Sequence, residues 1–249
     1  MLQLLRKIKN ALFINLAPLF KNSSFFLQGQ MDIHKKSAWY NKDLAGESGG
    51  FFLKGDPVQR EIAHTAPWDL VRRDMLILLL RSILERKIEG EMAELGVFKG
   101  LTAKLIHYYM PDRQLHLFDT FEGFDKKDKE ANDVAKDYFT DTSMKKVLRY
   151  IKPKNNNINI YPGRFPTSIP DTLQHTQFAF VHLDADLYEP ITAGLDFFYE
   201  RTPKGGFIVV HDYNAWPGAR RGADEFFKDK KEFPVPMPDK SGSALIIKE

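Results

Sequence analysis

The sequence predicts an α/β protein built on a doubly wound, mostly parallel sheet. Short apolar runs alternate with stretches of helical periodicity over most of the chain. Several of these runs also end in a polar or glycine-containing cluster. Strands that alternate with helices indicate βαβ units, whose parallel strands are covered on both faces. At 249 residues, the chain is long enough for one large domain or for a smaller domain with an appended arm.

The composition excludes several functional classes. Lys and Arg number 36 against 33 Asp and Glu, a formal net charge of only +3, which argues against a dedicated nucleic-acid binder. A hydrophobic fraction of 43% is enough for a core. Cysteine is absent from the sequence, which excludes disulfides, thiolate nucleophiles and cysteine-ligated metals. Any bound metal is therefore expected to have oxygen or imidazole ligands.

The first part of the chain differs from the rest. Residues 1–20 are mostly apolar with a basic start, as in a secretory signal, but Asn15 and Pro18 interrupt the apolar stretch. That stretch is also too short for the ~20 residues that span a bilayer. We interpret residues 1–60 as an amphipathic arm and loop segment, and residues 61–249 as the main domain. The arm is expected to pack on the domain or on a second subunit of a homo-oligomer. Contact with a membrane surface and a processed signal are the alternatives, and the expected location is cytoplasmic.

The predicted elements follow in order. A long helix over residues 67–88 is indicated by apolar residues at three- and four-residue spacing and by Pro67 at its start. Its apolar positions are Trp68, Val71, Met75, Leu78, Leu79 and Ile83. Strands are then predicted at 92–97, 115–118, 158–161, 178–183, 207–210 and 244–247, with helices at 101–110, 143–151, 191–200 and 219–230. The last run follows a proline-rich stretch and a Ser-Gly-Ser turn, so it is expected to form a terminal hairpin.

Polar residues fall where five apolar runs end. These clusters are residues 94–100, Asp119, Gly163, residues 184–186 and residues 211–212. In a doubly wound sheet, ligands bind outside the carboxyl ends of the strands. A single carboxylate after a strand is more often a helix cap, but five such clusters at one edge favour a binding site.

The first cluster indicates the kind of ligand. Gly96 and Gly100 allow close approach of the backbone, and the following helix N-terminus offers free N–H groups. Asp119 lies about 20 residues further on, the spacing at which an acidic residue on the second strand reaches a ribose diol. Together these features predict an adenosine-type ligand. The lack of the three-glycine pattern counts against NAD.

The clusters on the later strands contain side chains that bind metals. Asp184, Asp186, His211 and Asp212 follow neighbouring strands. Carboxylate oxygens suit Mg²⁺, Mn²⁺ or Ca²⁺, and an imidazole favours Mn²⁺, Fe²⁺ or Zn²⁺. Two alternatives stay open: Asp186 as a cap of the next helix, and His211 as a side chain packed in the rim. His182 is interpreted as a satisfied buried histidine rather than a catalytic one.

Four motifs in this order resemble the macrocin O-methyltransferase family. They are residues 94–102 (ELGVFKGLT), 117–124 (LFDTFEGF), 181–188 (VHLDADLY) and 205–213 (GGFIVVHDY). The family comprises bacterial class I, S-adenosylmethionine-dependent sugar O-methyltransferases of natural-product pathways. The match runs from about Thr65 to the C-terminus. Catechol O-methyltransferases are similar more distantly.

The resemblance implies a Rossmann-like class I methyltransferase sheet with seven strands, one of them inserted antiparallel by the final hairpin. It implies S-adenosylmethionine as cofactor and a small-molecule hydroxyl, of a sugar or glycoside, as acceptor. Glu94, Gly96 and Thr102 would hold the methionine end, and Asp119 the ribose hydroxyls. The full expected cofactor site comprises Glu94, Gly96, Phe98, Gly100, Thr102, Asp119 and Gly163.

The resemblance also implies a divalent metal at Asp184, with His211 and Asp212 as further candidate ligands. Better-known members carry Asp-Asp where this chain has His211 and Asp212, so Mg²⁺ is expected first and Mn²⁺ or another ion second. The catalytic lysine of the catechol enzymes corresponds to Leu187 here. Asp186 is therefore the first candidate for general base and His211 the second, with Asp184 at the reacting centre.

Two other functions were weighed against methyl transfer. A metal-dependent glycosyltransferase also uses a strand followed by Asp-x-Asp, but it lacks the glycine turn of residues 94–100. A non-catalytic methyltransferase-like binding module is the other alternative, although the intact carboxylate set argues against it. The acceptor cannot be identified from the sequence, but five aromatic residues are candidates to stack on it: Trp39, Tyr40, Phe51, Phe52 and Trp216.

Overall fold

The structure, a computed structural model, describes residues 69–128, 138–153 and 155–249. All of them belong to one compact unit, Thr65–Glu249. The predictions for residues 1–60, including the arm and its four aromatic acceptor candidates, lie outside the described residues. Within the described ranges, no helix combines the length and the apolar character that crossing a membrane requires.

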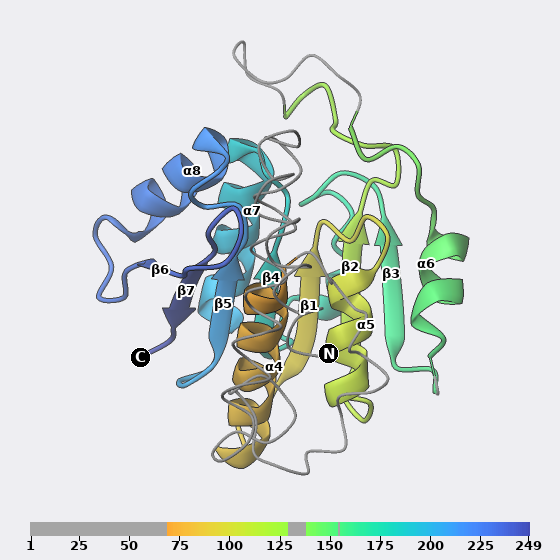
Figure 1. The fold of residues 1–249 in the computed structure, drawn as a ribbon, viewed down its shortest axis with the longest axis horizontal. Helices are drawn as coiled ribbons and strands as arrows, with labels where there is room; N and C mark the ends of the chain where they lie inside the picture. Colours follow the sequence, from red (N-terminus) through yellow and green to blue (C-terminus); the bar gives the residue numbers. More distant parts are fainter. Residues whose placement is uncertain (1–68, 129–137, 154) are drawn as a thin grey trace, which may run out of the picture. The chain divides into compact units, whose positions relative to one another are not determined.

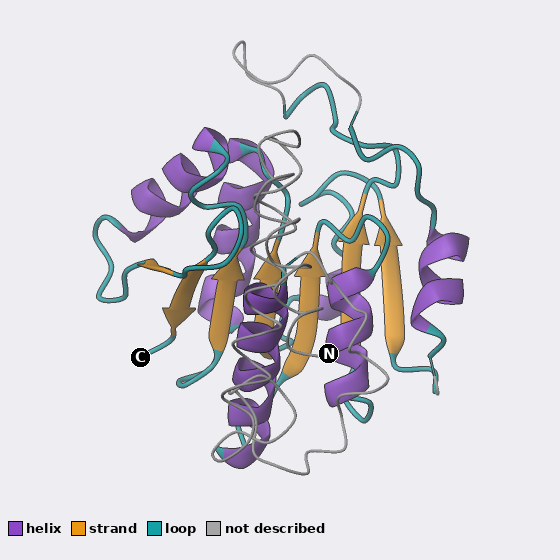
Figure 2. Ribbon diagram, in the orientation of Figure 1, coloured by secondary structure: helices purple, strands orange, loops and turns teal. Residues whose placement is uncertain are grey.

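The chain alternates between strands and helices, as Figure 2 shows. The helices are α4 (Leu70–Glu85), α5 (Leu101–Tyr109), α6 (Met144–Ile151), α7 (Tyr188–Phe198) and α8 (Pro217–Phe227), with 3-10 turns η2 (Asp171–Leu173) and η3 (Tyr199–Arg201). The strands are β1 (Glu91–Leu95), β2 (Leu115–Asp119), β3 (Ile158–Pro162), β4 (Phe178–Leu183), β5 (Phe207–Val210), β6 (Val235–Pro236) and β7 (Ala244–Ile247).

The strands form one seven-stranded sheet in the order β3-β2-β1-β4-β5-β7-β6 (Figure 1). β1 to β5 are parallel, and β7 runs antiparallel to both β5 and β6. The predicted doubly wound, mostly parallel sheet with a terminal hairpin is therefore confirmed. The strand order reverses between β1 and β4, and the crevice at such a switch point is where ligands bind in this class of sheet.

Successive side chains of the strands point to opposite faces of the sheet. Val181, Leu183 and Ile208 belong to the buried cluster that includes the inner side chains of α7 and α8. Glu94 and His182 alternate to the other face, where α4 and α5 lie (Figure 1). The polar side chains of Glu94 and His182 thus lie on the face of the sheet that α4 covers.

The buried face of α4 differs in part from the apolar repeat that predicts this helix. Leu78 is exposed, whereas Leu76 and Leu80 are fully buried, and the charged residues Arg72 and Asp74 are buried beside them. The helix carries apolar residues on nearly every side, so spacing alone does not identify the buried stripe. Its N-terminus is capped by Asp69, whose carboxylate accepts the N–H of Arg72 at 3.0 Å.

Two later helices begin earlier than predicted. α7 starts at Tyr188 and α8 at Pro217, because proline is tolerated in the first turn, where its missing N–H leaves no hydrogen bond broken. Pro190 lies in that first turn of α7.

Candidate active site

The parallel ladder continues past the ends of β1, β4 and β5. The N–H of Asp184 donates to the Leu95 carbonyl, and the N–H of His211 donates to the Leu183 carbonyl, both at 2.8 Å. These bonds hold Asp184 and His211 next to each other at the crevice between the two halves of the sheet.

A cavity of about 320 Å³ opens at this edge. Ten of the predicted site residues line it: Glu94, Gly96, Phe98, Thr102, Asp119, Gly163, Asp184, Asp186, His211 and Asp212. Gly100 is the exception. It is the left-handed N-cap of α5, and a Cβ there would lie 3.0 Å from Val147 of α6 rather than in the cavity. Its role is to turn the chain, so the sequence prediction that it contacts the cofactor is not supported.

The backbone at this edge is unusually constrained. Gly96 has a φ of 85°, and a Cβ there would lie 2.0 Å from the carbonyl oxygen of Asp184, so only glycine fits. Phe98, Asp186 and Asp212 adopt positive φ of 47°, 60° and 55°. Such conformations are uncommon for residues with a Cβ and cluster at functional sites.

Asp119 holds the glycine turn in shape. One carboxylate oxygen accepts the N–H groups of Val97 at 2.7 Å and Phe98 at 2.8 Å, and the other accepts that of Phe121 at 2.6 Å. The oxygen that accepts from Phe121 keeps a further lone pair, whereas both lone pairs of the other oxygen are used. Binding of ribose hydroxyls by Asp119 is compatible with this arrangement and stays a prediction.

Glu94 and His182 form a fully buried pair. They are register partners on β1 and β4, and His182 Nδ1 lies 3.1 Å from Glu94 Oε1. Burial, and then the Asp184 carboxylate, raise the pKa of Glu94 well above its usual range. Burial lowers the pKa of His182 to about 3, so its imidazole is neutral. Glu94 Oε2 and His182 Nε2 have no partner among the described residues, so His182 is buried as predicted but only half satisfied.

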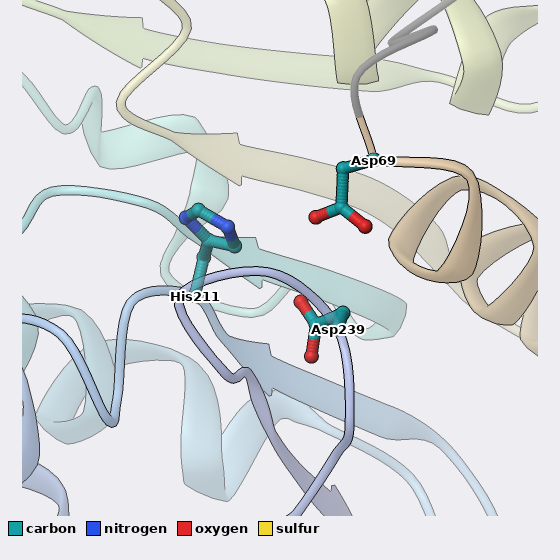
Figure 3. A group of neighbouring side chains, drawn as sticks. All are labelled: Asp69, His211 and Asp239. Atoms are coloured by element: carbon teal, nitrogen blue, oxygen red, sulfur yellow. The ribbon is translucent and has the colours of Figure 1, made fainter. Parts of the chain in front are cut away.

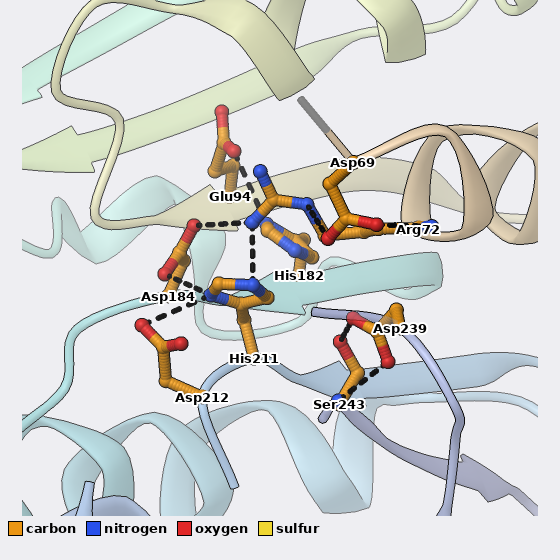
Figure 4. A network of polar contacts seen from close by, with 9 residues as sticks. All are labelled: Asp69, Arg72, Glu94, His182, Asp184, His211, Asp212, Asp239 and Ser243. Carbon is orange, nitrogen blue, oxygen red and sulfur yellow. Dashed lines mark hydrogen bonds and ion pairs between the residues drawn. The ribbon is translucent and has the colours of Figure 1, made fainter. Parts of the chain in front are cut away.

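Asp184, Asp186, Asp212 and His211 form the polar end of the cavity, and Figure 4 shows all of them except Asp186. His211 Nδ1 lies 2.8 Å from an oxygen of Asp184 and 3.2 Å from one of Asp212. Burial opposes charge on Asp184, but the neighbouring His211 outweighs it and lowers the pKa of Asp184. Burial, and then Asp184, raise the pKa of Asp186, which shares a hydrogen bond with Asp212.

The carboxylates fit a divalent cation. Ligand atoms of Asp184, His211 and Asp212 lie within 4.8 Å of one another. A buried oxygen of Asp186 has no partner in the part of the chain that the structure describes. Oxygen-rich sets of this kind suit hard cations such as Mg²⁺ and Mn²⁺. Whether the imidazole of His211 can be a ligand in such a site depends on the contacts of its second nitrogen, Nε2.

Arg72 contacts Nε2 of His211. The sequence did not predict Arg72 as a site residue. Its Nη1 lies 2.5 Å from His211 Nε2 and 3.8 Å from an oxygen of Asp184. Arg72 also lines the cavity, although α4 precedes the whole sheet in the chain. The sequence does contain a signal for a buried arginine. Arg72 stands four residues after Trp68 and three before Met75, so it places a charge within the apolar repeat of a helix.

A second acidic group lies on the Arg72 side of His211. Figure 3 shows Asp69 and Asp239 on the same side of the imidazole, and ligand atoms of the three residues lie within 4.8 Å of one another. Asp239 already accepts two hydrogen bonds at 2.7 Å, from the N–H and the hydroxyl of Ser243. Asp69 caps α4 and lies 3.7 Å from Arg72 Nε. The buried guanidinium thus supplies positive charge next to Asp69.

Aromatic side chains form one wall of the cavity. Phe98, Phe124 and Phe139 line it, with Phe139 in edge-to-face contact with Phe98 at 5.0 Å and with Phe124 at 5.3 Å. Trp216, the described aromatic acceptor candidate, packs behind Phe124 at 5.6 Å. Of the three phenylalanines in this wall, only Phe98 was predicted from the sequence, as part of the expected cofactor site.

A sequence model of the family described as Macrocin-O-methyltransferase (TylF) matches residues 63–244. The chain belongs to this family. The match covers the crevice, both glycines of the first turn and all of the acidic residues at the polar end of the cavity. The resemblance of the four motifs is thereby confirmed.

Characterised relatives are similar over the same domain. The chain is 25% identical over 167 residues to 8-demethyl-8-(2,3-dimethoxy-alpha-L-rhamnosyl)-tetracenomycin-C 4'-O-methyltransferase of Streptomyces olivaceus, covering 61% of this chain and 63% of that protein. It is 28% identical over 182 residues to Mycinamicin III 3''-O-methyltransferase of Micromonospora griseorubida, covering 66% and 70%. The chain thus spans somewhat less than two thirds of the first relative's length.

Solved structures share the fold. The O-methyltransferase NovP superposes with a TM-score of 0.65 at 18% identity, covering 91% of this chain and 99% of NovP. The calicheamicin methyltransferase CalS11 superposes with a TM-score of 0.61 at 17% identity, covering 87% and 91%. The fold of a class I methyltransferase is therefore confirmed.

Proposed function

We propose that this protein transfers a methyl group from S-adenosylmethionine to a hydroxyl of a sugar or glycosylated natural product. Family membership supports the reaction class, and the names of the two characterised relatives support the acceptor class. The observation that carries the proposal is one cavity lined by two unlike groups of side chains. The first is Glu94, with a buried oxygen that has no partner among the described residues, and the second is the carboxylates of Asp184, Asp186 and Asp212.

The first group of lining residues, at Glu94, suits the cofactor. A buried acceptor without a partner is costly unless a ligand satisfies it, and the ammonium of a methionine moiety would do so at Glu94 Oε2. Gly96 lines the cavity, where its missing side chain lets the backbone of Asp184 approach, and Thr102 lies in the first turn of α5, whose N-terminus offers free N–H groups. Phe98, Asp119 and Gly163 complete the wall along which the adenosine part would lie.

The second group, the three aspartates, suits the acceptor hydroxyl. Asp184 and Asp212 would hold a divalent cation, Mg²⁺ first, and this cation would lower the pKa of the hydroxyl and fix its position. Asp186 has the unpartnered oxygen in this group and is the proposed general base. Methyl transfer is an in-line displacement, so holding both reactants in near-attack geometry would supply roughly 7–11 kcal/mol of the barrier.

The wall of phenylalanines suits the body of the acceptor. Phe124 and Phe139 offer ring faces and edges to the apolar side of a sugar or to an aromatic aglycone. A flat or ring-shaped acceptor is therefore favoured over a flexible chain.

The direct test is turnover with S-adenosylmethionine, Mg²⁺ and a panel of glycosides, read by mass spectrometry as the gain of one methylene unit. Asp184→Ala should abolish turnover, and chelation should do the same in the wild type. Asp171→Ala changes an exposed aspartate on η2 and should leave turnover unchanged. Full activity of Asp184→Ala with a chelator present would overturn the metal proposal. Sugar transfer from a nucleotide-sugar would favour a glycosyltransferase, and cofactor binding without product a non-catalytic module.

A further inference from the structure

We propose that Arg72, His211 and Asp184 form a positioning relay, in which Arg72 keeps a hydrogen on Nδ1 of His211 so that the imidazole orients Asp184 and does not bind the metal. The three side chains come from α4 and from the ends of β5 and β4 (Figure 4). The part that concerns the metal rests on the function proposed above. The part that concerns the imidazole stands on the contacts alone.

The first step is the contact between Arg72 and His211. A guanidinium has five N–H donors and no acceptor. At 2.5 Å from Arg72 Nη1, Nε2 of His211 must therefore offer its lone pair. In the neutral imidazole the hydrogen then sits on Nδ1, where it donates to Asp184 at 2.8 Å.

The second step considers the other protonation states. An imidazolium also carries a hydrogen on Nδ1, so it too has no lone pair there. Only the tautomer with its hydrogen on Nε2 frees Nδ1 for a metal, and that hydrogen would point at the Arg72 donors. While Arg72 stays in place, His211 is therefore a donor to Asp184 rather than a ligand.

The third step is that Arg72 is itself held in place. It is buried, it lies on a helix, and Asp69 pairs with its Nε at 3.7 Å while capping the same helix. Asp239, the other carboxylate near the imidazole, is already bound to Ser243. The Nε2 side of His211 is thus closed by fixed groups.

The consequence concerns the choice of metal. A cation between Asp184 and Asp212 would meet only carboxylate oxygens and the acceptor, with no imidazole nitrogen. Such a site favours Mg²⁺ and Mn²⁺ over Zn²⁺, which prefers nitrogen or sulfur ligands. His211 in this chain would then act as the partner that orients a ligand, a role whose loss typically costs about 10–100-fold in metal affinity.

The relay is tested without metal by NMR on protein carrying ¹⁵N-labelled histidine, since protonated and lone-pair nitrogens resonate far apart. Wild-type His211, assigned with His211→Asn, should show its hydrogen on Nδ1. Arg72→Met should release this preference, whereas Arg73→Met, which removes the neighbouring arginine paired with Asp74, should not. A wild-type hydrogen on Nε2 with Nδ1 free would overturn the relay. Measurements on the wild type decide this even if Arg72→Met fails to fold.

The metal part is tested by adding Mn²⁺ and recording pulsed electron paramagnetic resonance, which detects a directly bonded ¹⁴N nucleus. The expected wild-type spectrum has no coupling from a histidine nitrogen. His211→Asn, which keeps an N–H for Asp184, should bind Mn²⁺ nearly as well, and His211→Ala should lose about 10–100-fold in affinity. A ¹⁴N coupling that disappears in His211→Asn would overturn the inference. If the wild type bound no Mn²⁺ or Mg²⁺, the proposed metal site would fail instead, and the NMR result would still decide the relay.

Discussion

His182 Nδ1 lies 3.1 Å from Glu94 Oε1 across neighbouring strands, and each of these fully buried side chains keeps one polar atom without a partner among the described residues. The hydrogen bond fixes which oxygen of Glu94 stays uncommitted at the cavity wall. On the function proposed above, His182 would position Glu94 for the cofactor's amino group.

Replacing His182 should therefore weaken only the methionine end of the cofactor site. For His182→Leu we expect roughly a 10-fold loss in affinity for S-adenosylhomocysteine, because Glu94 loses its orienting donor. Binding of 5'-methylthioadenosine, which lacks the amino-acid end, should not change. Both are measured by isothermal titration calorimetry.

His182→Asn is the matched control, since its amide N–H lies near the position of Nδ1 and should restore much of the affinity. Equal weakening of both ligands in His182→Leu would instead mean that the histidine only supports the local fold.

Gly96→Ala should prevent correct closure of the crevice. The added Cβ would lie 2.0 Å from the backbone oxygen of Asp184, so β1 and β4 would have to separate. We expect a loss of stability of at least about 2–3 kcal/mol and no measurable cofactor binding, by denaturant unfolding and calorimetry. Gly163→Ala is the comparison, because it also has a positive φ but its Cβ would meet nothing closer than 3.6 Å. It should show only the conformational cost of about 1–2 kcal/mol. Equal effects of the two variants would contradict the steric argument.

Phe124→Ala should weaken binding of the acceptor. Its ring connects Phe139 and Trp216 in the wall of the cavity. We expect KM for the glycoside to rise about 10-fold, in line with an aromatic contact of about 0.5–1.5 kcal/mol, with cofactor affinity unchanged. Phe233→Ala removes a phenylalanine that is 69% exposed and should leave KM unaltered. A loss of cofactor affinity in Phe124→Ala would mean that this wall contacts the cofactor and not the acceptor.

Glu232 should make the C-terminal strand sensitive to acid. Its carboxylate accepts hydrogen bonds from the Tyr199 hydroxyl at 2.7 Å, the Glu249 N–H at 3.1 Å and Lys248 at 3.2 Å. Burial alone would raise the pKa of Glu232, but these partners lower it to about 2 from the ordinary 4.5. A lowered pKa in the folded protein stabilises it above pH 4.5, and this contribution is lost as the pH falls toward 2.

Urea unfolding of wild type and Glu232→Gln measures this contribution. We expect a difference of about 1–3 kcal/mol at pH 7 that shrinks steadily below pH 4.5. Glu200→Gln on η3, an exposed carboxylate, should show no such dependence. A difference that stayed constant from pH 7 to pH 3 would rule out the ionised form of Glu232 as its source.

The sequence by itself determined the sheet and most of the cavity lining. Short β-branched and aromatic runs, separated by helices, allow few arrangements other than a parallel sheet, and parallel strands deliver their carboxyl ends to one edge. Gly96, Asp119, Asp184 and His211 were therefore placed correctly, because each follows directly from where its strand stops.

Only the tertiary structure decided which residues approach this edge from outside the strands. Arg72 meets His211 across 139 positions of sequence, from a helix whose apolar residues lie on nearly every side. The pairing of Glu94 with His182 depends on the register of β1 against β4. Such contacts are selected by packing between elements, and local periodicity contains no information on which faces will meet.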